Sequence, residues 1–459
     1  MEILGADAKG RVHFIGIGGI SMSSIAMILK KNGYTVTGSD INKSHITEAL
    51  CDMGIKVYFG HNEENVKGAS LVVFTAAIKK DNPEYCYAVE NNIKIVERSV
   101  FLGELMRAYK SPLCISGTHG KTTTTSMVSL ILQEAGLDPT CLIGGVVKEL
   151  GGNLRMGGKD IFVTESCEYV ESFLKFYPHT AVILNVDEDH LDYFRDINHI
   201  ISAFAKFAAL VPENGKVFVN GEDENSLKAV KDAKCEVLTF GTKDIFDAVA
   251  KNIAFDDLGK ASYDFYYKGG FITKINLAVP GKHNVFNSLA AAASCYSYGA
   301  SKEAIAKVLK EFKGTERRFE FKGMFEGAYI YDDYAHHPTE IKAALSAAKG
   351  CAKGKLRVIF QSHTYTRTHA LLKEFSESFD LADEIIVTKI YAAREKDTGL
   401  VKPTDLTDLL VKRGKDAKYI ATFEEIEDYI RKTAQKDELI ITVGAGNVVE
   451  VGENLLKKM

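Results

Sequence analysis

The sequence predicts an α/β protein of three domains, and three observations lead to that prediction. Its 459 residues are enough for about three domains of ordinary size. Apolar runs of five to seven residues alternate with longer helical patterns, which is typical of parallel strands connected by helices. Two glycine-rich turns, at residues 16–21 and 116–123, each follow an apolar run and open a helical pattern.

The first domain is expected to span residues 1–109, and a new series begins at residues 110–112, where Pro112 precedes a fresh apolar run. Within this domain the hydrophobic periodicity predicts strands and one early helix. The expected strands are 12–17, 35–38, 71–75 and 93–96, and the expected helix is 21–31.

The second domain is expected at residues 110–313 and the third at residues 314–459. Between about residues 217 and 279 the pattern changes to short strands with little helix. Elsewhere strands are predicted at 113–116, 160–164, 181–185, 329–331, 356–360, 384–388 and 439–443, and a small-residue helix at 285–298.

Composition excludes several classes of protein. The 57 basic and 61 acidic residues leave a net charge of −4 that is mixed along the chain, which argues against nucleic-acid and membrane-surface partners. No apolar run approaches the roughly 20 residues of a membrane span, and the N-terminus shows no signal-peptide pattern. The eight cysteines include no CxxC pair. We therefore expect a cytoplasmic, multidomain protein. Small-molecule partners are expected, and the chain is expected to be a monomer or a weak homodimer.

The first glycine-rich turn has the pattern of a dinucleotide-binding loop. Gly16, Gly18 and Gly19 would let the backbone approach a pyrophosphate, and Ser21 stands where the fingerprint has its third glycine. Asp40, 22 positions after Gly18, stands where an acid would bind a ribose hydroxyl. A tight turn without a ligand and an NAD site are both compatible with this signal.

The second turn, Gly117-Thr118-His119-Gly120-Lys121-Thr122-Thr123, resembles a P-loop, although only part of the strict spacing is present. Backbone N–H groups of such a loop surround phosphates, and its lysine neutralises the β- and γ-oxygens. The hydroxyl of Thr122 would ligate Mg²⁺. This turn therefore predicts that the chain binds ATP or GTP.

Polar residues follow the later strands of the second and third domains. Glu165 and His190 stand at predicted strand ends, where they could hold a metal near the phosphates. The neighbouring acids at 187–189 could instead be solvated loop residues. Asn284 could pair with a base edge or act as an N-cap. Paired histidines at 336–337 favour anion or nucleotide contacts, and Arg367 could clamp a carboxylate or phosphate.

Together these motifs resemble the Mur ligases of peptidoglycan synthesis, in the order of that family and over essentially the whole chain. The motifs are residues 16–23, 38–40, 77–84, 117–123, 189–192, 281–287, 317–319, 332–340, 360–368 and 444–447. The resemblance implies a Rossmann-like N-terminal domain, a P-loop central domain of ATPase type and a Rossmann-like C-terminal domain.

The resemblance also implies ATP-dependent amide-bond formation through an acyl phosphate, with Mg²⁺ or Mn²⁺ as the metal. The implied substrates are UDP-N-acetylmuramate and L-alanine. The carboxylate of the sugar nucleotide would attack the γ-phosphate, and the amino group would then attack the acyl phosphate. Cations must screen the two anions that meet in such a step.

Site residues are carried over from the family's motifs in four groups. The sugar nucleotide is assigned to Gly18, Gly19, Ser21, Asp40, His61 and Arg98. ATP is assigned to Gly117, Thr118, His119, Gly120, Lys121, Thr122, Thr123, His283, Asn284, Asn287, Arg318 and Asp333. The metal ligands would be Thr122, Glu165 and His190, and the catalytic residues Lys121, His190, His336 and Arg367.

The sequence departs from the family pattern at Cys167, where an aspartate is usual, at Thr364, where an arginine is usual, and at Arg394. Glu168 could compensate for the missing aspartate. Three alternatives stay open at this point. They are a recycling ligase of the same fold that adds a preformed peptide, an NAD-dependent oxidoreductase suggested by the first turn, and a regulatory ATP-binding module suggested by Thr364.

Overall fold

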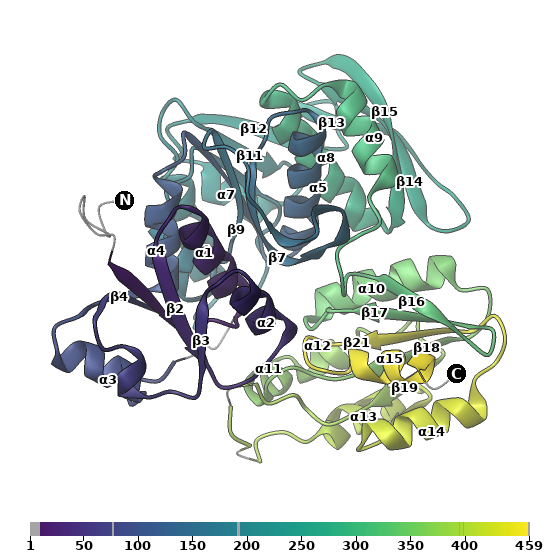
Figure 1. The fold of residues 1–459 in the computed structure, drawn as a ribbon. Coiled ribbons are helices and arrows are strands. Elements are labelled where there is room, and N and C mark those ends of the chain that lie inside the picture. The colour runs from purple at the N-terminus through teal and green to yellow at the C-terminus, as the bar shows by residue number, and fades with distance from the viewer. Residues whose placement is uncertain (1–9, 76–77, 191–192, 394, 398, 458–459) are drawn as a thin grey trace. The chain divides into compact units, whose positions relative to one another are not determined.

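The computed structural model describes residues 10–75, 78–190, 193–393, 395–397 and 399–457, and it contains three separate sheets (Figure 1). Of the predicted motif residues, Ala77, Leu191, Asp192 and Arg394 lie outside this part of the chain. The chain groups into two compact units. One holds residues 1–186, 201–238 and 298–300, and the other holds residues 187–200, 239–297 and 301–459. No helix in the described ranges is long and apolar enough to cross a membrane.

The first sheet has five parallel strands in the order β3-β2-β1-β4-β5, and helices connect them. The strand expected at 12–17 ends at Ile15, because Gly16 has a φ of 80° and turns the chain. The elements are β1(Arg11–Ile15), α1(Ile20–Lys31), β2(Thr35–Asp40), α2(His45–Asp52), β3(Lys56–Phe59), η2(Glu63–Asn65), β4(Ala69–Phe74), α3(Pro83–Glu90), β5(Lys94–Glu97) and α4(Arg98–Met106).

The second sheet has ten strands in the order β15-β14-β13-β12-β11-β10-β6-β9-β7-β8. Its central strands are parallel, whereas β13–β15 at one edge and β7–β8 at the other are antiparallel. The elements are β6(Ser111–Ser116), α5(Lys121–Glu134), β7(Thr140–Val147), η3(Lys148–Leu150), β8(Gly152–Arg155), β9(Ile161–Ser166), η4(Tyr169–Lys175), β10(Thr180–Ile183), α6(Ile197–Ala208), β11(Lys216–Asn220), α7(Glu224–Val230), β12(Glu236–Gly241), β13(Ala248–Phe255), β14(Lys260–Tyr267), β15(Gly270–Pro280), α8(Lys282–Ser297) and α9(Lys302–Glu311).

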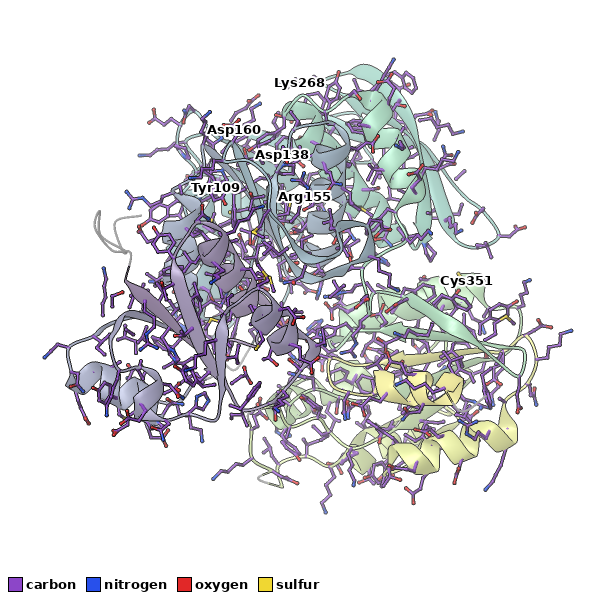
Figure 2. The ribbon with its side chains drawn as sticks, in the orientation of Figure 1. Tyr109, Asp138, Arg155, Asp160, Lys268 and Cys351 are labelled. Carbon is purple, nitrogen blue, oxygen red and sulfur yellow. The ribbon has the colours of Figure 1, made fainter. Side chains whose placement is uncertain are left out.

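Two predicted strand ends in this sheet are corrected. β9 continues through Glu165 to Ser166, so Glu165 lies within the strand rather than after it. β10 ends at Ile183, two residues earlier than expected, and Asn185 lies in the loop that follows. Tyr109, which is labelled in Figure 2 and precedes β6, packs on Phe162 with 4.8 Å between their ring centroids.

The third sheet has six strands in the order β16-β17-β21-β18-β19-β20, all parallel except the edge strand β16. Apolar side chains on its two faces form separate cores against the surrounding helices. The elements are β16(Glu320–Phe325), β17(Ala328–Asp333), α10(Pro338–Cys351), β18(Leu356–Phe360), α11(Tyr365–Ala370), α12(Leu372–Ser376), β19(Glu384–Val387), α13(Pro403–Lys412), β20(Ala417–Tyr419), α14(Phe423–Thr433), β21(Leu439–Val443) and α15(Val449–Lys457).

A buried ionic cluster lies at the N-terminal edge of this third sheet. Arg357 is 2% exposed, and its Nε lies 2.7 Å from Glu384 Oε2 and 3.0 Å from Glu438 Oε1. Lys355 and Lys418 also contact the carboxylate of Glu384, at 2.6 Å each. Ligands of open α/β sheets bind at the opposite, carboxyl edge of the strands, so this cluster stabilises the domain away from its ligand edge.

Candidate functional site

The glycine-rich turn of the first domain is held by its own sheet. The N–H groups of Gly16 and Ile17 donate to the carbonyl oxygen of Ser39 at 2.8 and 2.9 Å. The N–H of Gly18 donates to Asp40 Oδ2 at 2.8 Å, so the acid of the fingerprint lies against the glycines. α1 begins at Ile20 after Gly19, which supplies no side-chain cap. The N–H group of Gly18 is therefore already paired with the side chain of Asp40.

The other predicted sugar-nucleotide residues lie at the same carboxyl edge of this sheet. His61 follows β3, and its Nδ1 lies 3.1 Å from Ser39 Oγ, at the end of β2. Arg98 opens α4 directly after β5, and its Nη1 lies 3.4 Å from Ser21 Oγ. The structure thus brings the predicted set together at the edge where α/β sheets bind ligands.

The phosphate loop of the central domain joins β6 to α5, as the sequence predicts. Gly117 and Gly120 have φ values of 140° and 85°, and a Cβ at Gly117 would lie 2.9 Å from Leu184 Cβ. Asn185, in the segment that follows β10, holds the phosphate loop in place. Its Oδ1 accepts from His119 N at 2.8 Å, its Nδ2 donates to His119 O at 3.0 Å, and its carbonyl accepts from Thr118 N at 3.1 Å.

Lys121 is paired with a buried carboxylate. Its Nζ lies 3.0 Å from Glu168 Oε2 and donates to the carbonyl oxygens of Gly117 and Thr118 at 2.5 and 3.1 Å. Burial opposes the charge on Lys121, but the neighbouring carboxylates, Glu168 above all, raise its pKa above the ordinary lysine value. The lysine is therefore cationic over the whole physiological pH range.

Thr122 and Glu165 form an oxygen-lined group beside the loop. Thr122 Oγ1 donates to Glu165 Oε2 at 3.0 Å, and Glu165 Oε1 accepts from Gly144 N at 2.6 Å. Hydroxyl and carboxylate oxygens are the ligands that Mg²⁺ prefers, so this donor set fits a magnesium ion. Glu165 lies within β9 and not at the strand end where we expected it.

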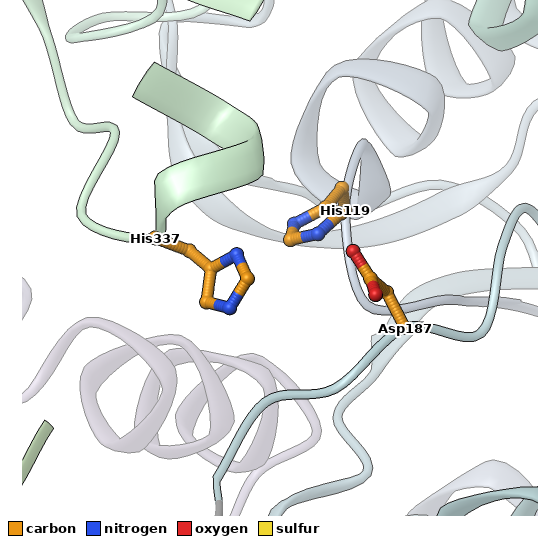
Figure 3. A group of neighbouring side chains, drawn as sticks. All are labelled: His119, Asp187 and His337. Carbon is orange, nitrogen blue, oxygen red and sulfur yellow. The ribbon is translucent and has the colours of Figure 1, made fainter. Parts of the chain in front are cut away.

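Asp189 and His190 follow β10 and belong to the second compact unit. Asp189 is buried, and its Oδ1 accepts from Arg367 Nη2 at 3.1 Å. Burial opposes the ionisation of Asp189. Electrostatic attraction from its neighbours, which include His190 and Arg367, nevertheless lowers its pKa below the ordinary range. His190 Nε2 lies 3.7 Å from Asp189 Oδ2. Figure 3 shows the preceding Asp187 of this segment.

The predicted adenine contacts lie at the start of α8. Asn284 and Asn287 are both buried, and Asn287 Nδ2 donates to Asn284 Oδ1 at 3.1 Å. Asn284 Nδ2 donates to the carbonyl oxygen of Pro280 at 2.7 Å, so this side chain is not an N-cap, which would accept from a backbone N–H. His283, the residue before Asn284, is exposed.

Asp333 ends β17 and holds the segment that enters the third domain. Its two carboxylate oxygens accept from Phe319 N at 2.8 Å and from Ala335 N at 2.7 Å. Burial raises the pKa of Asp333 to about 7, although Arg318 opposes that shift. The Arg318 guanidinium also lies 5.3 Å from the ring centroid of Tyr334.

His336 and Arg367 come together at the carboxyl edge of the third sheet. The rings of His336 and His363 lie 5.8 Å apart, and Arg367 Nη1 lies 3.4 Å from His363 Nδ1. Burial lowers the pKa of His336 to about 4, although Glu340 opposes that shift. The imidazole of His336 is therefore neutral at physiological pH. The next residue, His337, caps α10 and is labelled in Figure 3.

The structure describes two of the three departures from the family pattern, Thr364 and Cys167. Thr364 caps α11, since its Oγ1 accepts from Arg367 N at 3.4 Å, so it positions the arginine that follows. Cys167 is exposed, whereas Glu168 points to Lys121. Our interpretation of the sequence missed Asn185 and the pairing of Glu168. The available signal was the position of Asn185, because it is the first side chain after β10 that can form hydrogen bonds with the phosphate loop.

The fold defines an α/β protein with three sheet-containing domains, two of which carry a glycine-rich turn between a strand and a helix. Three family models match consecutive parts of it: "Mur ligase family, catalytic domain" at residues 11–110, "Mur ligase middle domain" at residues 115–295 and "Mur ligase, glutamate ligase domain" at residues 317–446. The chain belongs to the Mur ligase family, which confirms the resemblance and the predicted fold class.

Several proteins similar to this chain are named as ligases of UDP-N-acetylmuramate. The UDP-N-acetylmuramate–L-alanine ligase of Caldanaerobacter subterraneus subsp. tengcongensis is 52% identical over 98% of this chain and 97% of its own length. The crystal structure of a UDP-N-acetylmuramate–alanine ligase from Thermotoga maritima is 30% identical, covers 98% of this chain and 99% of that chain, and has a TM-score of 0.83. A UDP-N-acetylmuramate:L-alanyl-γ-D-glutamyl-meso-diaminopimelate ligase from Neisseria meningitides is 28% identical over 67% of this chain and 99% of that one, with a TM-score of 0.61.

Proposed function

We propose that the chain is an ATP-dependent ligase that joins L-alanine to UDP-N-acetylmuramate in the synthesis of peptidoglycan precursors. The observation that carries this proposal is the 52% identity, over nearly the full length of both chains, to a UDP-N-acetylmuramate–L-alanine ligase. The phosphate loop with Lys121 and the oxygen pair of Thr122 and Glu165 supply the chemistry that such a reaction needs.

The reaction has two steps. A carboxylate oxygen of the sugar nucleotide attacks the γ-phosphorus of ATP, ADP leaves, and an acyl phosphate forms. The amino group of L-alanine then attacks the acyl carbon, an amide bond forms, and phosphate leaves. Both reactants of the first step are anions, so positive groups must lie around the γ-phosphate. Lys121 and the loop N–H groups supply them from the protein.

Mg²⁺, or Mn²⁺ in its place, would be held by Thr122 and Glu165, with His190 as a ligand of a second ion. When bound, the metal neutralises phosphate charge. The protein's own residues do the positioning: Asn185 holds the loop, and Glu168 keeps Lys121 charged and fixed in direction. In the third domain His336 and Arg367 would bind the amino acid, and Arg318, Asp333 and the asparagines of α8 would hold ATP.

The first domain would bind the sugar nucleotide through the set at its carboxyl edge. We assign residues 1–109 to this task, residues 110–313 to ATP and metal, and residues 314–459 to the amino acid and to closure over the other substrates. The enzyme would act in the cytoplasm as a monomer or weak homodimer, which size-exclusion chromatography with light scattering would check.

The decisive test measures phosphate release with each substrate left out in turn. Turnover should require ATP, Mg²⁺, UDP-N-acetylmuramate and an amino acid together, with L-alanine preferred over glycine and serine. Phosphate release that does not depend on the sugar nucleotide would contradict the proposal.

Two of the earlier alternatives are separable in the same assay. A recycling ligase would prefer a preformed peptide to L-alanine as the acceptor, and the Neisseria meningitides ligase named for a peptide is 28% identical to this chain, against 52% for the L-alanine ligase. A regulatory ATP-binding module would release no amide product. The oxidoreductase alternative does not explain the phosphate loop and is not supported by the family to which the chain belongs.

A further inference from the structure

The buried carboxylate of Glu84, in the first domain, contacts the side chain of His61. Glu84 is 0% exposed and lies in the first turn of α3, which Pro83 opens and Asn82 caps. Glu84 is not among the residues that the family's motifs assign to a substrate in this sequence. Acidic residues are favoured at a helix N-terminus, but this position does not require the side chain to be buried.

The carboxylate is fully engaged by donors. Glu84 Oε1 accepts from Asn65 Nδ2 at 2.6 Å, and Oε2 accepts from Ser39 Oγ at 2.5 Å. His13 Nε2 lies 3.8 Å from Oε2. Burial alone would raise the pKa of Glu84, but these donors lower it to about 2. The side chain is therefore ionised at physiological pH and can only accept hydrogen bonds.

This fixes the proton on His61. The single hydroxyl proton of Ser39 goes to Glu84 Oε2, so Ser39 Oγ has only lone pairs left to offer. His61 Nδ1 lies 3.1 Å from Glu84 Oε2 and 3.1 Å from Ser39 Oγ. Nδ1 therefore faces two acceptors and must carry the ring proton. In the described residues no hydrogen bond is made by His61 Nε2, and in a singly protonated ring that atom is an acceptor.

We infer that Glu84 is a positioning residue that holds His61 as its Nδ1–H tautomer, so that Nε2 accepts a hydrogen bond from an N–H or O–H group of the sugar nucleotide. The identity of the ligand rests on the proposed function, whereas the tautomer does not. An acceptor cannot bind a phosphate oxygen. His61 therefore recognises the uracil imide or a hydroxyl of ribose or of the amino sugar, and not the diphosphate.

The first experiment is ¹⁵N NMR of the histidine side chains in the full-length protein without ligand at pH 8.5, with the His61 signals assigned from His61→Gln. The Nδ1–H tautomer is expected at His61. In Glu84→Gln the amide oxygen is required by Asn65, so the amide nitrogen faces His61, and the ring proton should move to Nε2. An Nε2–H tautomer in the wild-type protein would overturn the inference even if the variant failed to fold.

The second experiment compares steady-state kinetics. Glu84→Gln should raise KM for UDP-N-acetylmuramate about tenfold, with kcat and KM for ATP within twofold, because one ligand hydrogen bond becomes a donor–donor contact. Glu90→Gln removes an exposed carboxylate from the same helix and is the matched control, with no change expected. An unchanged KM for the sugar nucleotide in Glu84→Gln would also overturn the inference.

Calorimetric binding of UDP alone identifies the donor. Equal weakening of UDP and of the complete sugar nucleotide in Glu84→Gln places the donor on the uridine, and weakening of the sugar nucleotide alone places it on the sugar. If phosphate release did not depend on UDP-N-acetylmuramate in the wild-type enzyme, the proposed function would fail, while the NMR result would still decide the tautomer.

Discussion

Replacing Lys121 with alanine should affect stability and catalysis by separate amounts, both of which follow from its pairing with Glu168. The Glu168 side chain is 2% exposed and that of Lys121 is 16% exposed. Removing one partner of a buried ion pair costs about 3–5 kcal/mol, and the partial exposure of Lys121 favours the lower end, about 3 kcal/mol. Loss of a preorganised positive group at the transition state should lower kcat by about two to three orders of magnitude.

The assay combines urea unfolding with phosphate release under saturating substrates. A double variant, Lys121→Met with Glu168→Gln, separates the two effects because it leaves no unpaired charge. Its stability should return to within about 1 kcal/mol of the wild type, while kcat should stay low. A loss of kcat below threefold in Lys121→Ala would refute the catalytic role. Recovery of activity together with stability in the double variant would show that the lysine acts only on the fold.

Three further predictions concern the fold around the sites. Arg357→Met should lower the free energy of unfolding by about 3 kcal/mol or more, since it leaves Glu384 and Glu438 without their shared cation, and kcat of the folded enzyme should not change; a lower kcat would contradict the placement of this cluster away from the ligands. The pKa of Glu384 is lowered to about 2, because its hydrogen bonds and ion pairs outweigh burial, so its contribution is present above about pH 4.3 and is lost as the pH falls toward 2. Urea unfolding between pH 7 and pH 3 should show a loss of about 2 kcal/mol from this group, out of about 3 kcal/mol that would be lost by pH 2 and below, and Glu384→Gln should remove that loss; an equal pH dependence in the variant would argue against it. Gly38→Ala would bring a Cβ within 2.5 Å of Ile17 Cδ1, 2.6 Å of Ile17 Cβ and 2.8 Å of the carbonyl oxygen of Phe14 and should destabilise the protein by about 1–3 kcal/mol, measured by thermal unfolding; an unchanged melting temperature would contradict the crowding.

Local sequence signals predicted most of the fold. A glycine-rich turn between an apolar run and a helical pattern can be recognised from a short stretch of sequence, and both such turns occur where they were expected. The ends of strands were less certain, because a residue such as Glu165 can continue a buried strand when its carboxylate finds partners on a neighbouring loop. Those partners are set by the packing of the sheet and not by the local pattern.

The supporting residues of the candidate site could not be predicted for the same reason. Asn185 and His119 are 66 positions apart, and Glu84 and Ser39 are 45 apart. The contact in each pair depends on which strands are neighbours, and a motif such as 77–84, which contains Glu84, does not show which side chain that residue contacts. Motifs identify the residues that face a ligand, whereas the residues that orient them become visible only when the sheet order is known.

The hydrogen bonds from Asn185 also bear on how the enzyme works when ATP is scarce. A loop whose backbone is already fixed at Thr118 and His119 loses little conformational freedom when a nucleotide arrives. The phosphate loop becomes ordered once, when the protein folds, and not again in every catalytic cycle. Nucleotide binding therefore requires little further ordering of the phosphate loop, and falling ATP levels would slow the enzyme through lower occupancy, with the loop keeping its shape between turnovers.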